Sequence, residues 1–170
     1  MPARGVFKSR TRGIQLDQGD ILANVPLVNW KNGKAKEAPN RAVVTSHGCV
    51  CEDYERATEA NRSSAADRVQ IQVAPLVPAS NFKEKINLIQ EGKLLDYFFV
   101  EGDGQKLNHQ VAVLAREQPV PAPLLVECPT VAQLADWQWE ALRLHLTICR
   151  FRCDPKEIFR DELLTNAEIG

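Results

Sequence analysis

Hydrophobic and polar residues along the chain form short patterns typical of strands. Residues 20–28 and 41–46 are mostly apolar, and residues 69–76 alternate apolar with polar side chains, as a strand with one wet face does. Pro26 has no N–H for a strand ladder, so the first run predicts an edge strand or one that ends early. Residues 29–37 are polar, contain an Asn-Gly turn signal and predict a basic loop.

A second set of strands is predicted further along the chain. Residues 94–100 and 109–115 are strand-like runs on either side of the Asp103-Gly104 pair. Because Asp-Gly is a frequent turn sequence between antiparallel strands, the two runs predict a hairpin.

Helical patterns occupy three other places. Ser80 is placed to cap a helix over residues 81–92. Apolar residues at helical spacing, preceded by Thr130 as a cap, predict a long helix over 131–153. The polar, alanine-containing residues 52–67 predict an exposed helical or irregular insertion.

Together these elements predict an α+β fold, mainly β. We expect a small antiparallel barrel with a mid-chain helix and a long C-terminal helix. Residues 16–153 form one predicted domain, between a basic lead-in over 1–15 and a tail over 154–170 whose first residues, Asp154-Pro155, suggest one more short helix.

Bulk composition narrows the function. The 170 residues carry a net charge of −1, with 44% hydrophobic and 25% charged residues. Proteins held to nucleic acid mainly by phosphate contacts usually carry a basic surplus, so binding over the whole surface is not indicated. No apolar run is long enough to span a bilayer. Five cysteines with no secretory signal predict reduced thiols and a cytoplasmic location.

Three segments, in this order, resemble one known family. They are Gln18-Gly19-Asp20-Ile21, Asn40-Arg41-Ala42-Val43-Val44-Thr45-Ser46 and Val73-Ala74-Pro75-Leu76. The late strand from His109 and the closing helix also fit. The chain is similar to the MazF/PemK family, the toxin half of toxin–antitoxin pairs. This resemblance implies an SH3-like β-barrel, a homodimer, an antitoxin or larger protein assembly as partner, single-stranded RNA as ligand, and no cofactor.

Two departures from the family pattern bear on catalysis. The Arg-Pro pair of the family is Arg41-Ala42 here, and Pro75-Leu76 is followed by Val77-Pro78 in place of a hydroxyl residue. In active members the arginine and that hydroxyl act together on the scissile phosphate. We therefore expect an interaction domain for protein or nucleic acid without ordinary toxin catalysis. The alternative is a metal-independent endoribonuclease that leaves a cyclic phosphate.

The densest group of chemically active residues spans 45–54, directly after the Arg41 strand. Four interpretations are open. The cysteines are small packing residues at a strand end, or a phosphate groove forms from Arg41, Ser46 and His47. Alternatively, His47, Cys49 and Cys51 hold a metal, helped by Asp53 or by Cys149 and Cys153. In the fourth, His47 activates Cys49 as a nucleophile, since residues two apart on a strand share a face.

The basic loop adds candidates for nucleic-acid binding. Lys31, Lys34 and Lys36 lie on it, and Trp30 is placed to stack on a base. A packing role for Trp30 is the competing interpretation.

Overall fold

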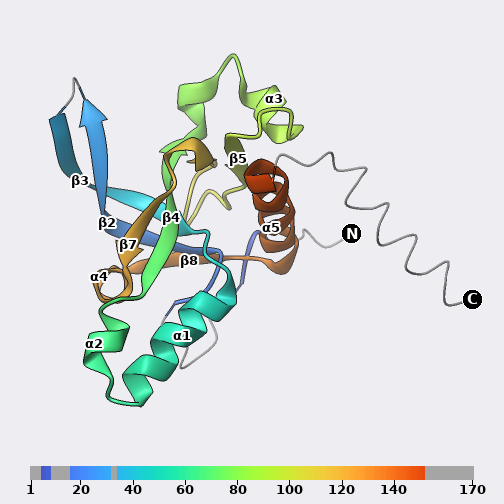
Figure 1. Ribbon diagram of the computed structural model, residues 1–170. Coiled ribbons are helices and arrows are strands. Elements are labelled where there is room, and N and C mark those ends of the chain that lie inside the picture. The colour runs from blue at the N-terminus through green and yellow to red at the C-terminus, as the bar shows by residue number, and fades with distance from the viewer. Residues whose placement is uncertain (1–4, 9–15, 32–33, 152–170) are drawn as a thin grey trace, which may run out of the picture.

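The computed structural model describes residues 5–8, 16–31 and 34–151. Within them the chain is α+β, as the sequence predicts: a curled antiparallel sheet with helices at its ends and faces (Figure 1). The strands are β1 (Phe7–Lys8), β2 (Asp20–Lys31), β3 (Lys34–Val44), β4 (Gln70–Pro78), β5 (Tyr97–Val100), β6 (Gln110–Val113), β7 (Gln118–Pro121) and β8 (Thr130–Leu134). The α-helices are α1 (Gly48–Glu59), α2 (Ser63–Ala66), α3 (Ile86–Gln90), α4 (Ala122–Val126) and α5 (Asp136–Phe151).

Strand order in the sheet is β1-β8-β2-β3-β4-β6-β5, and β7 pairs with β4 beside this path. Every pairing is antiparallel. The predicted hairpin of residues 94–115 is confirmed, because Val100 pairs with Gln110 and Tyr97 with Val113. β4 bridges the two halves of the sheet, since it pairs with β3 and β7 through its first part and with β6 through its last residues.

Two hydrophobic clusters lie on opposite faces of the sheet. Alternate residues of a strand point to opposite faces, so Val44 of β3 belongs to the cluster with α1 and α4, whereas Val43 belongs to the cluster with α5. Cys51 and Tyr54 bring α1 into the first cluster. Leu142 brings α5 into the second cluster. Figure 1 accordingly shows α1 and α2 at one end of the molecule and α3 at the other.

Packing explains why glycine and aspartate stand at positions 19 and 20. Gly19 has a φ of 87°, and a Cβ added to it would lie 3.1 Å from Cδ1 of Trp139. Asp20 is fully buried, and its Oδ2 accepts the N–H of Asp17. A glycine followed by a buried carboxylate therefore starts β2 against α5.

Several predicted bounds are wrong. The long helix begins at Asp136 and not at Val131, because residues 130–134 form β8 between β1 and β2. Sheet pairing there overrides the local helical spacing. Ser80 does not cap a helix: it lies in a 3₁₀ turn over Ala79–Phe82, and α3 begins later, at Ile86.

The predicted basic loop is a second difference. β2 continues past Pro26 to Lys31, and Pro26 pairs opposite Pro39 of β3. Because both partners at that position are prolines, neither strand presents an N–H that the other fails to satisfy. Residues 29–31 and 34–37 therefore belong to a long two-stranded arm that extends away from the rest of the sheet (Figure 1).

Candidate functional site

The cluster over residues 45–54 lies where β3 ends and α1 begins. Ser46 is buried, and its Oγ accepts the N–H of Gln72 at 2.7 Å, so this hydroxyl fastens the end of β3 to β4. Thr45 donates its hydroxyl to Glu117, and Glu117 also binds Arg150 at 2.6 Å. These polar groups link the strand end to the last turn of α5.

His47 and Cys49 form an exposed pair at the N-terminus of α1. His47 is the N-cap residue, and its Nδ1 accepts the N–H of Cys49 at 3.3 Å. The same nitrogen lies 3.2 Å from Sγ of Cys49. The two side chains therefore lie close together, so that the thiol can donate its proton to the imidazole, but they do so at the start of a helix and not, as predicted, on one face of a strand.

Cys51 faces the other way. It is 2% exposed and packs into the cluster under α1. Burial, followed by the negative charges of Asp17, Asp20 and Glu55, raises the pKa of the Cys51 thiol to about 12. Among the residues that the structure describes, no three His, Cys, Asp or Glu side chains are grouped to hold a metal ion. Cys153, the remaining metal candidate, lies outside the described residues.

Alkylation should separate the two cysteines of this cluster. At pH 8 a thiol with a pKa near 12 is ionised in about one molecule in 10⁴, and the thiolate is the reactive form. We expect iodoacetamide to modify exposed Cys49 at least tenfold faster than Cys51 in the folded protein, as followed by peptide mass spectrometry. His47→Ala should slow Cys49 if the imidazole takes its proton, whereas His109→Ala serves as control. Equal rates for both thiols would contradict the burial of Cys51.

Arg41 lies at a different place. It is exposed on β3, five residues before Ser46, which is about 16 Å along a strand. The structure therefore does not bring Arg41 together with Ser46 and His47. Arg41 instead lines a cavity of about 510 Å³ with Ser80, Asn108 and His109. Its other lining residues are Pro78, Ala79, Gly102, Gly104 and Gln110.

The described lining of this cavity carries positive charge and no negative charge. Arg41 brings a permanent positive charge, and none of the described residues that line the cavity is Asp or Glu. Ser80, Asn108 and Gln110 add uncharged donors and acceptors. Such a lining suits an anion that carries several oxygen acceptors.

The loop over residues 101–109 holds one wall of the cavity in shape. Oδ1 of Asp103 accepts the backbone N–H groups of Gln105, Lys106 and Leu107, between 2.8 and 3.2 Å. Desolvation opposes ionisation of Asp103, but these hydrogen bonds together outweigh it and lower the pKa of the carboxyl. The loop is thus tightest with Asp103 ionised.

His109 has a defined tautomer in this wall. Its Nδ1 accepts the N–H of Gly102 at 3.0 Å, and its ring lies 5.4 Å from that of Phe99. Because Nδ1 is the acceptor, the proton of the neutral ring lies on Nε2. This cavity-lining residue therefore carries a hydrogen-bond donor at Nε2.

Sequence reasoning missed Ser80, Asn108 and His109 as partners of Arg41. Ser80 was predicted as a helix cap and His109 as the start of a strand. The sequence signal was weak, because the residues come from β3, from the turn after β4 and from the loop before β6. The strand pairing explains their proximity: β4 places Pro75 opposite Ala42 of β3 and Pro78 opposite Gln110 of β6.

The remaining nucleic-acid candidates lie on the β2–β3 arm. Trp30 pairs with Ala35 and Lys31 with Lys34 through the backbone, and Lys36 pairs with Asn29. The side chains of Trp30 and the three lysines lie outside the described part of the structure. By strand rise, Lys34 and Lys36 lie about 16–23 Å along β3 from Arg41.

Comparison with protein-family models finds no match, and no curated protein matches the sequence. Within the described residues, no helix is both long and apolar enough to cross a membrane.

Proposed function

We propose that this chain is a divergent SH3-like barrel of the MazF/PemK type that binds the phosphodiester backbone of single-stranded RNA at the Arg41 cavity, without ordinary toxin catalysis. The observation that carries the proposal is the lining of that cavity. Arg41, Ser80 and His109 converge there, and no described lining residue is acidic. An arginine with neighbouring neutral donors is the arrangement that holds a phosphate.

The β2–β3 arm supports a polymeric ligand over a single phosphate. Lys34 and Lys36 lie on the same strand as Arg41, and Lys31 lies on the paired strand β2, so the arm adds basic residues near β3, with Glu37 between Lys36 and Arg41. Single-stranded nucleic acids bind basic surfaces through their backbones, with aromatic side chains as stacking platforms. Trp30 on the arm has the right chemistry for that second role.

Binding without cleavage is favoured by the state of His109. Cleavage that forms a cyclic phosphate needs a base to take the proton of the ribose 2′-hydroxyl. The neutral His109 ring carries its proton on Nε2, because its Nδ1 accepts the N–H of Gly102. Arg41, Ser80, Asn108 and Gln110 are poor bases at neutral pH.

The endoribonuclease alternative rests on Ser80. The family hydroxyl is missing directly after Leu76, but Ser80 brings a hydroxyl into the cavity of Arg41. If the His109 ring exchanged its tautomer during the reaction, Nε2 could act as the base.

Binding to labelled single-stranded RNA tests the proposal. Fluorescence anisotropy in chelator would compare wild type with Arg41→Ala and with Arg68→Ala, an exposed arginine outside the cavity. A charged hydrogen bond contributes about 1.5–3 kcal/mol, so Arg41→Ala should weaken binding about tenfold to a hundredfold. The slope of log affinity against log salt should fall by about 0.7, because one phosphate contact is lost.

The control variant and the Arg41 variant have different expected results. Arg68→Ala should bind within about twofold of wild type, since an exposed charge away from the ligand contributes little. Equal binding by Arg41→Ala would overturn the proposal. Gel analysis of the same samples addresses the alternative: Arg41-dependent products with a cyclic phosphate would make the chain an endoribonuclease.

A further inference from the structure

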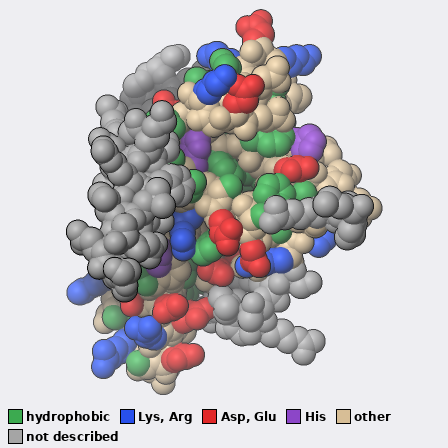
Figure 2. All heavy atoms as spheres, turned by 90° about the vertical axis from the view of Figure 1, so that its right-hand side faces the viewer, with side chains coloured by type: hydrophobic (Ala, Val, Ile, Leu, Met, Phe, Trp, Pro, Cys, Tyr) green, Lys and Arg blue, Asp and Glu red, His purple; other side chains and the backbone are tan. Residues whose placement is uncertain are grey.

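A large apolar groove runs along α5 on the side away from the α1 cluster. It has a volume of about 1,100 Å³ and lies between α5 and residues 89–101. Its floor includes Phe98, and Leu95 and Leu144 are each 39% exposed on its sides. Figure 2 faces this side of the molecule and shows hydrophobic side chains gathered at its centre with acidic groups beside them.

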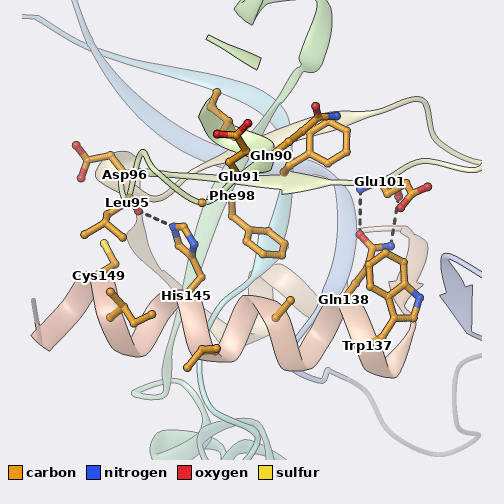
Figure 3. Close-up of a pocket in the computed structure, with 16 residues that line it drawn as sticks. Gln90, Glu91, Leu95, Asp96, Phe98, Glu101, Trp137, Gln138, His145 and Cys149 are labelled. Carbon is orange, nitrogen blue, oxygen red and sulfur yellow. Dashed lines mark hydrogen bonds between the residues drawn. The ribbon is translucent and has the colours of Figure 1, made fainter. Parts of the chain in front are cut away.

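Polar contacts fix the two walls of the groove to each other at both ends (Figure 3). At one end, Nε2 of His145 lies 2.9 Å from the carbonyl oxygen of Leu95, and burial lowers the pKa of this imidazole. At the other, Gln138 bonds to the backbone of Glu101. The groove is therefore a built feature with a fixed width, and Trp137, Ala141, Leu144 and Ile148 mark its length along α5.

The chain itself leaves α5 beside this groove. Ile148 and Cys149 line the groove, and α5 ends at Phe151, so residues 152–170 start at the groove's own end. A segment that turned back there would run along the groove antiparallel to α5. Two antiparallel helices joined by a short loop are a common arrangement.

The sequence of residues 154–170 suits a helix that turns back. Asp154 with Glu157 three residues later forms a capping-box pattern, and Pro155 stands at the first helical position. Phe159, Leu163 and Ala167 then recur every four residues and form an apolar stripe. A helix over residues 155–168 would be about 21 Å long, and the groove face of α5 from 137 to 149 is about 18 Å long.

One charge pair supports this direction. Asp96 is an exposed groove residue near the Cys149 end, whereas Glu91, nearer the middle, is already paired with Lys93 at 2.6 Å (Figure 3). Lys156 lies next to the apolar stripe on the helical wheel, and acidic Glu157 and Asp161 lie away from it. In the antiparallel direction Lys156 comes first, toward Asp96.

We propose that residues 155–168 form a helix that docks into the α5 groove of the same chain, with Phe159 and Leu163 inserted between α5 and residues 89–101. This docking covers the apolar surface that Leu95 and Leu144 expose. It is independent of RNA binding, because the Arg41 cavity shares no lining residue with the groove.

Hydrogen exchange measured by mass spectrometry on the full chain tests the docking. In wild type, amides of residues 155–168 should exchange at least tenfold more slowly than in Phe159→Asp or Leu163→Asp, which place a charge in the stripe. Thr165→Asp is the matched control: it adds the same charge away from the stripe and should keep the protection. Leu144→Asp, at an exposed position of the groove, should remove the protection from the other side.

The other occupants of the groove are outcomes of the same experiment. Protection that is constant over a hundredfold range of protein concentration, with the protein monomeric by sedimentation, supports docking within one chain. Protection that appears only with a dimer assigns the groove to a second copy and overturns the proposal. Rapid exchange of residues 155–168 in wild type, or protection that survives Leu144→Asp, overturns it too.

Discussion

Replacing Gln138 with alanine is expected to lower the free energy of unfolding by about 3–4 kcal/mol. Gln138 is 1% exposed on α5. Its Oε1 accepts the N–H of Glu101 at 2.9 Å, and its Nε2 donates to the carbonyl of Val6 at 2.7 Å and to that of Glu101 at 3.3 Å. One amide thus joins α5, the end of β5 and the N-terminal segment beside β1.

The size of this effect follows from what truncation leaves behind. Alanine removes the side-chain partner of several backbone groups at once, and each buried group left unsatisfied costs about 1–3 kcal/mol. Val6 retains the N–H of Ala135 at 3.1 Å, so its carbonyl is not stranded. The loss therefore comes mainly from the cavity that truncation of the buried Gln138 side chain leaves, with a smaller loss at Glu101, which is exposed to water.

Urea denaturation followed by circular dichroism measures this loss. Glu140→Ala is the matched control, because Glu140 is exposed on the same helix and should change stability by less than about 0.5 kcal/mol. A Gln138→Ala protein within 1 kcal/mol of wild type would show that the amide does not join the three segments in solution.

Replacing Gly102 with alanine should weaken RNA binding, because it changes the shape of the cavity. A Cβ at Gly102 would lie 2.2 Å from the carbonyl oxygen of Leu107 and 2.4 Å from the carbonyl carbon of Asn108. Both are backbone atoms, so the loop must move. Overpacking of this kind costs about 1–3 kcal/mol. The movement also breaks the Gly102–His109 hydrogen bond, and we expect affinity for single-stranded RNA to fall at least tenfold.

Gly104→Ala serves as the control that separates the effect of the clash at Gly102 from the effect of backbone strain in the same loop. Gly104 has a φ of 72°, and a Cβ there would meet no atom within 4 Å. Alanine at this position costs about 1–2 kcal/mol of backbone strain but creates no clash. Unfolding and anisotropy measured on both variants give the comparison. Equal affinities for Gly102→Ala and wild type would mean that the position of His109 does not matter for binding.

The sequence predicted the elements whose periodicity matches their final surroundings. Residues 69–73 alternate because Ile71 and Val73 lie in one core while Gln70 and Gln72 are exposed or half-buried, although residues 73–76 are buried on both faces; residues 94–115 form the expected hairpin. Residues 131–134 were predicted as the start of the long helix, with Thr130 as its cap, since their apolar residues continue the spacing of α5. Their pairing with β1 and β2 is a contact between distant segments, which no local window contains.

In the candidate site, too, local contacts were easier to predict from the sequence than contacts between distant segments. The contact between His47 and Cys49 was expected from a strand, but it forms at the N-terminus of α1, where His47 is the cap. The surroundings of Arg41 were not predictable, since Ser80 comes from the 3₁₀ turn after β4 and His109 from the loop before β6. Ser46 looked available as a hydroxyl, but its bond to Gln72 depends on the pairing of β3 with β4.

The place of β8 between β1 and β2 affects how the chain is made. β2 leaves the ribosome early, but the neighbour that covers one of its edges is added roughly 100 residues later, which takes about 5–20 s at typical rates of synthesis. An uncovered strand edge is a template for pairing with another chain. Nascent molecules on the same message are therefore at risk of joining through β2, and fast translation or a chaperone that shields this edge should raise the yield of folded protein.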